Sequence, residues 1–448
     1  MNPLSKPQTL RVLTAALALA LTAAPSWSAE PQSAKAAAAP PLQIALPALS
    51  DLPSPSLPQA ATVDQLLAAT PALREAQSMQ QAAAQNGAVL RAGTNEFTGQ
   101  AQVQQRRIES LPDSGRYNEW QLLINRQLRL PSQAQADGRM AEALQTSAQA
   151  TLVTTRLQVL DALLTAWFAA QRAQAEAALA QQDLDLIDAQ VKALQRRQSL
   201  GDASVLELEQ MQAEQARARS TLLRAQGVAA SSRAALLARY PALSRSGSLQ
   251  GQTDPGALAL PSLNAEQLSA RAVQASPLLL QQRAMLQKAQ AMVAQAHAAR
   301  TPQPTVGAYI GSDRGGSERI VGLQFAMPFG GPARESQERA ALAEADAAQW
   351  RLRDLQAQVE ADFQRLYADA QAQEAAVKAT EQAAQVQTQA SNRMLRAYQL
   401  GEVGVSDWLL ARRNALESAK LVLQSRFDAA TSSAQLKLQT GLLYELTP

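Results

Sequence analysis

The sequence predicts a mainly α-helical fold with a small β part, built from two similar halves. A stretch at 196–207 recurs at 396–407 with an Arg, a Leu-Gly pair, an acidic residue, a Val and a second acidic residue at matching positions. Each copy interrupts a long helical pattern, and Leu-Gly at such a break is typical of a helix that ends in a left-handed glycine. The 448-residue chain is rich in Ala and Gln, and only 4% of it is aromatic. This composition favours long, thin helices over large globular cores.

Residues 1–28 have the pattern of a secretory signal peptide. Lys6 and Arg11 precede an apolar run from 12 to 23, and small residues follow this run. We expect cleavage after Ser28, where the small-residue rule is met. The other interpretation of this segment is an N-terminal membrane anchor.

The chain contains no cysteine, which excludes disulfides, zinc–thiolate sites and a lipid attached to an N-terminal Cys. We therefore expect a non-lipidated mature protein. The 41 basic and 38 acidic residues nearly balance and alternate along the helices, which argues against a nucleic-acid-binding surface. Residues 29–61, rich in Pro and Ala, predict an extended N-terminal linker.

Two repeats follow, at 62–243 and 264–448, joined by a Gly-, Pro- and Ser-rich linker at 244–263. In each repeat we expect a helix, a β-hairpin, a long helix, a tip and a returning helix. The first helix should run from about 64 to 93, and its counterpart from about 264 to 300. Each passes through a Thr-Pro or Ser-Pro site, because Pro is tolerated in an early turn.

The β-hairpins are predicted at about 98–130 and 304–329, where the apolar residues change to a period of two. Alternation is clear in the second hairpin and poorer in the first, where Gln and Arg fill many positions. Four short strands cannot close a membrane barrel, which needs at least about eight. Other copies of the chain must supply the missing strands, so we predict a lipid-facing side formed by Val321, Leu323, Phe325 and Met327.

Each hairpin is followed by a very long helical pattern, at 132–200 and 333–400. At about 1.5 Å per residue, each helix would reach on the order of 100 Å. Apolar residues recur at steps of three and four, as in Leu157, Leu160 and Leu164, so these helices must pack along their length against other helices. The tips are expected at 200–201 and 400–401.

The signal peptide, the twofold repeat, the two β-hairpins, the long helices and the paired tips together resemble the TolC-like outer membrane efflux proteins. The resemblance covers the chain from about Asp64 to the C-terminus. It implies a homotrimer whose strands share one twelve-stranded barrel in outer membrane lipid, continued by an α-barrel of antiparallel helical hairpins across the periplasm. It also implies the exit duct of a tripartite exporter, in which a periplasmic adaptor protein and an inner-membrane pump meet the tips at Leu200, Gly201, Leu400 and Gly401.

Within this family, residues 92–97 and 120–131 are most similar to the branch that serves heavy-metal cation efflux, where Asn-Pro-Glu-Leu is usual. Here Thr94-Asn95-Glu96-Phe97 lacks the Pro and has Phe in place of Leu. The exported substrate, a metal cation or an organic compound, would be a property of the pump.

Two acidic residues beyond the tips are candidates for a pore constriction. In TolC-like proteins, acidic side chains after the second tip form rings that narrow the periplasmic entrance, and Asp407 falls at one such position. The next ring position of the family lies three residues after Asp407 and is Leu410 in this chain. In the first repeat, Glu207 is the residue that matches Asp407. The alternative for both acids is a first-turn residue that stabilises its own helix dipole.

No catalytic, metal or cofactor site can be recognised in the sequence. His297 is the only histidine, so one chain cannot build a Ser-His-Asp triad or a multi-histidine metal site, and we expect an ordinary surface histidine. No phosphate-binding loop precedes a helix. We expect that the protein is not an enzyme. A soluble periplasmic coiled-coil adaptor or structural spacer is the alternative function, although it leaves the two strand hairpins unexplained.

Overall fold

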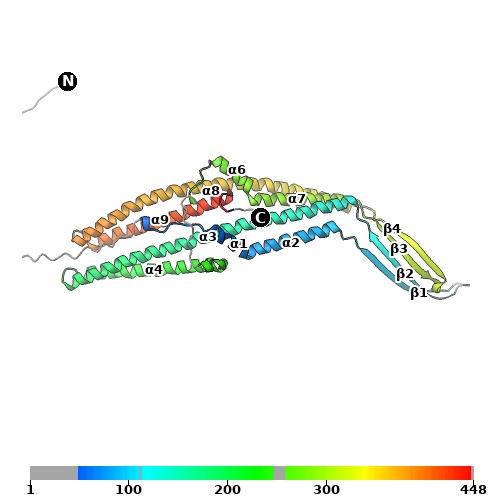
Figure 1. Ribbon diagram of the computed structural model, residues 1–448, viewed down its shortest axis with the longest axis horizontal. Helices are drawn as coiled ribbons and strands as arrows, with labels where there is room; N and C mark the ends of the chain where they lie inside the picture. Colours follow the sequence, from blue (N-terminus) through cyan, green and yellow to red (C-terminus); the bar gives the residue numbers. More distant parts are fainter. Residues whose placement is uncertain (1–48, 110–111, 113, 247–257, 445–448) are drawn as a thin grey trace, which may run out of the picture. The chain divides into compact units, whose positions relative to one another are not determined.

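The computed structural model describes residues 49–109, 112, 114–246 and 258–444 (Figure 1). The chain divides into two compact units, residues 1–43 and 44–448, and every described residue belongs to the second. The predicted signal peptide, its cleavage site, the first part of the N-terminal linker and much of the linker between the repeats lie outside the described residues. No helix in the described part has both the length and the apolar character needed to cross a membrane.

The two halves contain the same elements in the same order. After η1 (Leu49–Asp51), the first half comprises α1 (Ala60–Ala69), α2 (Pro71–Ala92), β1 (Phe97–Ile108), β2 (Gly115–Gln127), α3 (Pro131–Ser199), α4 (Val205–Arg239) and η2 (Pro241–Ser246). The second half comprises α6 (Ala265–Ala275), α7 (Pro277–Ala298), β3 (Thr305–Asp313), η3 (Arg314–Gly316), β4 (Glu318–Ala326), α8 (Pro332–Leu400) and α9 (Val405–Gln439).

Corresponding helices of the two halves have equal lengths. Helices α2 and α7 each contain 22 residues, α3 and α8 each contain 69, and α4 and α9 each contain 35. The predicted fold class, mainly α with a small β part, is confirmed.

The Thr-Pro and Ser-Pro sites divide helices that we expected to be continuous. Thr70 has extended angles, φ −74° and ψ 126°, so that α1 ends before it and Pro71 begins α2. Ser276 separates α6 from α7 in the same way, with φ −63° and ψ 112°. The physical reason is steric, because the proline ring disfavours the helical region for the residue before it. Pro is accepted as the first residue of a new helix, where no intrahelical donor is needed.

Helix α3 lies at the centre of the helical part. Helices α2, α4, α7 and α9 all pack on it, and α8 packs on both α7 and α9. The predicted seam of α3 is buried, with Leu160 and Leu164 at 0% and Trp167 at 2% exposure. These residues form one hydrophobic cluster with Leu423 and Phe427 of α9. Burial of a large apolar side chain contributes about 1.5–3 kcal/mol, so this cluster binds the two halves together.

Residues 49–59, predicted as part of an extended linker, form a strap that packs on the helices. Leu52 and Leu57 of the strap are buried in the same cluster. The Trp167 indole donates a hydrogen bond to the Ser56 carbonyl (2.6 Å), and the Gln171 amide accepts from the Ser56 N–H (3.1 Å). Backbone groups of this short segment thus form hydrogen bonds with side chains of α3, although its Pro-rich sequence shows no helix or strand period.

The four strands form one antiparallel sheet in the order β1-β2-β3-β4. The pairing of β2 with β3 joins the two halves and sets Leu122 opposite Ile310 and Ile124 opposite Ala308. Strands β1 and β4 therefore form the two edges of the sheet, and among the described residues each pairs on one side only. Unpaired N–H and C=O groups along such edges are ready to pair with another chain.

Candidate functional site: one sheet face and two helix tips

One face of the sheet is apolar and exposed across all four strands. Partners that lie opposite each other project to the same side, so the register groups residues from both hairpins on what we call the apolar sheet face. Its large side chains are Phe97, Val103, Trp120, Leu122, Ile124, Val306, Ile310, Val321, Leu323 and Phe325, all of them exposed in the single chain. Leu323, in the edge strand β4, is 88% exposed.

Three of the four residues predicted to face lipid, Val321, Leu323 and Phe325, lie in β4 on this face. Met327 follows the last residue of the strand and is also exposed. The first hairpin contributes as many of these large apolar side chains as the second, because Gln100, Gln102 and Gln104 all fall on its opposite side.

The opposite face of the sheet is polar and tightly arranged. Its Glu119, only 2% exposed, accepts a hydrogen bond from Gln104 (2.8 Å) and pairs with Arg106 (3.2 Å). The Tyr309 ring lies across Gly322 of the next strand, where an added Cβ would collide with it. The sheet therefore has one apolar, exposed face and one polar face held by hydrogen bonds and an ion pair.

The two tips have the same backbone structure. Gly201 and Gly401 have left-handed φ values of 86° and 79°. In the first tip the Asp202 N–H donates to the Arg197 carbonyl (2.9 Å), and in the second the Glu402 N–H donates to the Ala397 carbonyl (2.9 Å). This pattern is a Schellman motif, which needs a residue without a Cβ penalty at the left-handed position.

Both tips present apolar and small groups to their surroundings. Leu200 is 77% and Leu400 is 66% exposed, and a Cβ added to Gly201 or Gly401 would meet nothing within 4 Å. The tips lie at the same end of the helices, because one cluster behind them contains residues from α3, α4, α8 and α9 (Figure 1). Within that cluster the rings of Tyr398 and Trp408 are stacked, with 5.8 Å between their centroids.

The two candidate acids after the tips have different surroundings. Glu207 forms a capping box with Ser204: the Glu207 N–H donates to Ser204 Oγ (3.1 Å), and the Ser204 N–H donates to the Glu207 carboxylate (3.4 Å). Asp407 is exposed in the first turn of α9, where Gly404 provides no side-chain cap. The carboxylate of Asp407 therefore remains available for solvent or ions, whereas that of Glu207 serves the start of α4.

A buried ion network behind the tips was not foreseen from the sequence. Arg412 of α9, 1% exposed, donates to Asp183 of α3 (2.6 Å) and to Glu214 of α4 (3.1 Å), and Arg413 also binds Glu214 (2.6 Å). Arg412 continues the three-and-four spacing of the buried residues Val405, Trp408, Ala415 and Ala419. A charged residue at a position of the apolar three-and-four pattern is therefore the sequence signal for this buried network.

The two carboxyl groups of this network have opposite pKa shifts. Burial raises the pKa of Asp183, and its contacts with Arg412 oppose that shift only in part. Burial would also raise the pKa of Glu214, but hydrogen bonds from Arg413 and Arg412 outweigh it and lower this pKa to about 2. Glu214 is therefore ionised at neutral pH and holds two arginines at the junction of three helices.

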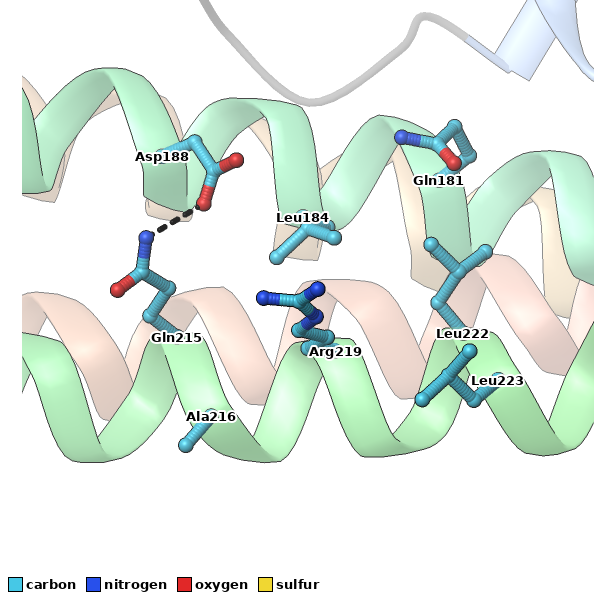
Figure 2. Close-up of a pocket in the computed structure, with 8 residues that line it drawn as sticks. All are labelled: Gln181, Leu184, Asp188, Gln215, Ala216, Arg219, Leu222 and Leu223. Atoms are coloured by element: carbon cyan, nitrogen blue, oxygen red, sulfur yellow. Dashed lines mark hydrogen bonds between the residues drawn. The ribbon is translucent and has the colours of Figure 1, made fainter.

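A groove of about 570 Å³ lies between α3 and α4 (Figure 2). Asp188 accepts a hydrogen bond from Gln215 across it (2.8 Å), and the Arg219 guanidinium points between the helices toward Leu184. The eight lining residues include neither a histidine nor a hydroxyl, so the groove lacks the hydroxyl nucleophile and histidine base of a Ser-His pair.

His297 lies on the surface as expected, with its side chain 70% exposed and its Nδ1 atom 2.7 Å from Glu338. Among the described residues, no group of three or more His, Asp or Glu side chains is placed to hold a metal ion.

Comparison with known proteins identifies the fold. No protein-family model and no curated protein sequence matches the chain. The outer membrane protein VceC from Vibrio cholerae is 20% identical, over 86% of this chain and 96% of VceC, with a TM-score of 0.69. The Campylobacter jejuni CmeC outer membrane channel is 14% identical, over 87% and 86% of the two chains, with a TM-score of 0.71.

A membrane protein from Pseudomonas aeruginosa is 15% identical, over 88% of this chain and 92% of its own, with a TM-score of 0.74. The TolC-like fold expected from the sequence is therefore confirmed. Of these structures, CmeC is an outer membrane channel and VceC is an outer membrane protein. The heavy-metal branch stays a prediction.

Proposed function

We propose that this chain, which has the TolC-like fold, is the outer membrane channel of a tripartite efflux system. Three copies place their strands side by side in one twelve-stranded barrel, and their helices continue as a tunnel across the periplasm. A periplasmic adaptor and an inner-membrane pump deliver substrate at the tips. Substrate then leaves the cell through the barrel. The similarity to channels such as CmeC supports this assignment.

The observation that carries the proposal is the apolar sheet face together with its two open edges. None of the described residues covers this face, and a contiguous exposed apolar patch marks an interaction surface. Lipid suits the face, but an unpaired backbone group in lipid costs several kcal/mol. Edges β1 and β4 must therefore pair with other copies, and a closed ring of three chains leaves no edge.

The alternative, a soluble periplasmic adaptor or spacer, accounts for the helices alone. It would leave Leu323 and the side chains around it facing water. The helical end supports the export function instead, since Leu200 and Leu400 offer exposed apolar contacts there for an adaptor. Asp407, exposed beside the second tip, is the best candidate for the constriction, and Glu207 is a weaker candidate because of its capping box.

Cell fractionation and mass measurement test the proposal. The full chain, expressed with its own N-terminus, should be recovered in the outer membrane fraction, and detergent-solubilised particles should have three times the mass of the mature chain. The intact mass of that chain should show no attached lipid. Recovery as a monomer in the soluble periplasmic fraction would favour the coiled-coil alternative and exclude the channel.

A further inference from the structure

The apolar sheet face ends in arginines at the hairpin turns. The alternation that sets Val103 and Trp120 on this face also places Arg107, Arg116 and Arg319 on it. Arg107 and Arg116 lie beyond the row of Val103 and Trp120, whereas Arg319 lies in that row, next to the last apolar residue of β4 on this face. We call these three residues the distal arginines. All three are exposed. The face is thus an apolar band with a cationic border at the end farthest, along the strands, from the helices.

Two of the distal arginines are direct neighbours. Arg107 of β1 and Arg116 of β2 lie opposite each other in the register, and like charges at such positions destabilise a strand pair. Arg107 has one acidic partner, the exposed Glu109 at 3.3 Å. Within the described part of the chain, Arg116 and Arg319 make no ion pair. This border therefore carries excess positive charge that the described residues do not neutralise.

The arginine at the other end of the same face has a different environment. The Arg126 guanidinium lies over the Phe97 ring, 4.7 Å from its centroid, and its Nε donates to the Asn95 carbonyl (3.0 Å). Arg126, the cation next to the helices, thus has interaction partners within the chain itself. The distal arginines, in contrast, have donors left for an external anion.

We infer that Arg107, Arg116 and Arg319 bind the phosphate groups of lipid in the outer leaflet of the outer membrane. The inference rests on the proposed function, because a barrel whose helices enter the periplasm has its hairpin turns at the outer leaflet. From Phe97 to Val103 the apolar rows span about 20 Å along the strand, close to the apolar band of about 25 Å in outer membrane barrels. Arg107 and Arg116, beyond these rows, then lie at the depth of the headgroups, and Arg319 lies at the border of the band.

Guanidinium chemistry favours phosphate as the anion. The planar fork of Arg donates two parallel hydrogen bonds to phosphate oxygens, and a multiply charged headgroup neutralises two arginines that otherwise repel each other. Because β1 and β4 are the sheet edges, barrel closure brings β4 of a neighbouring copy beside β1. One lipid at such a junction meets Arg107 and Arg116 from one chain and Arg319 from the next.

Lipid retention by purified trimers tests the inference. Trimers are reconstituted into vesicles of phosphatidylcholine that contain lipid A, a glucosamine lipid with two phosphates, and are re-extracted in mild detergent. The lipid A retained per trimer is counted by native mass spectrometry. The wild type should retain lipid A in preference to phosphatidylcholine. Retention should weaken on the order of fivefold for each of Arg107→Gln, Arg116→Gln and Arg319→Gln, and most in the triple variant.

Two control variants isolate the headgroup contact. The triple Lys substitution at the same positions keeps the charge and should retain most of the lipid A. A triple Gln substitution of the exposed helical residues Arg224, Arg233 and Arg271 removes the same charge elsewhere and should retain lipid A at the wild-type level. Each single Gln variant is also measured, so that an assembly defect in the triple variant does not decide the result.

Equal retention by wild-type and single-variant trimers would overturn the inference and leave the proposed channel intact. A free-anion site would also overturn it: in that case millimolar inorganic phosphate would raise the melting temperature of the trimer in pure phosphatidylcholine as much as lipid A does. If the protein is absent from the outer membrane or forms no trimer, the proposed function fails and the inference fails with it.

Discussion

Arg412 is buried where α3, α4 and α9 meet, and it holds two carboxylates. Removal of one partner from a buried ion network leaves unpaired charge and typically costs about 3–5 kcal/mol. Arg412→Ala should therefore lower the free energy of unfolding by that order. Arg413→Ala, which removes a half-exposed partner of the same Glu214, should have a clearly smaller effect. Urea unfolding followed by circular dichroism measures both, and equal losses would refute this account.

Glu214 should make stability pH-dependent in acid. Its pKa of about 2 in the folded state lies below the unfolded value of about 4.3, so the folded state binds fewer protons between these values. Its stabilising contribution is complete above about pH 5 and is lost as the pH falls toward about 2. The gap in melting temperature between wild type and Glu214→Gln should close over that range. A gap that stays constant with pH would contradict the assignment of this acid dependence to Glu214.

The raised pKa of Asp183 acts in the opposite direction, since protonation of that buried carboxyl favours the folded state. The acid-induced loss due to Glu214 should therefore be steeper in Asp183→Asn than in the wild type, because this variant lacks the opposing group.

Asp407 should influence ion selectivity if it lines the constriction. Three copies of an exposed carboxylate near the axis would attract cations and repel anions. Asp407→Asn should lower the cation selectivity of single channels in a planar bilayer. Glu207→Gln is the matched control, because the Glu207 side chain caps α4 and should affect conduction less. Unchanged selectivity in Asp407→Asn would leave the helix-dipole interpretation of this residue.

At the scale of elements, the two tips behave as equivalent Schellman turns whose glycines face open space. A β-branched residue with left-handed φ costs on the order of 1–2 kcal/mol, which is small for a large trimer. Gly401→Val, alone and with Gly201→Val, should leave trimers in the outer membrane at normal levels but abolish export in cells that contain the pump and adaptor.

Gly227→Val is the control for the tips, since Gly227 lies within α4 and also has open space around it. It should support normal export. Normal export by the tip variants would show that the tips are not the docking surface. Loss of trimers would assign the glycines a role in folding.

At the scale of the whole molecule, the absence of cysteine allows a direct test of assembly. Strands β1 and β4 are opposite edges of a four-stranded sheet, about 14 Å apart at the usual strand spacing. A disulfide needs Cα atoms within about 7 Å, so cysteines in β1 and β4 can bond only between copies. Pairs that combine Gln102→Cys with cysteines scanned along β4 should give crosslinked trimers on denaturing gels. Monomers from every pair would refute barrel closure.

The sequence by itself determined the features that depend on neighbouring residues. Helix ends at Leu-Gly, strand alternation at 305–326 and helical seams are local patterns, because backbone conformation and side-chain direction repeat over a few residues. These patterns gave the order of elements, both tips and the fold class. They failed at Thr70 and Ser276, where a local rule for the residue before proline divides a helix.

Only the tertiary structure decided how distant segments combine. The pairing of β2 with β3 joins two modest hairpins into one apolar face, and no local pattern specifies that register. Arg412 is buried because Asp183 and Glu214, each about 200 residues away, converge on it. The strap at 49–59 is ordered by side chains of α3. In each case the stabilising group lies far along the chain, so its contribution exists only after the helices and strands have packed.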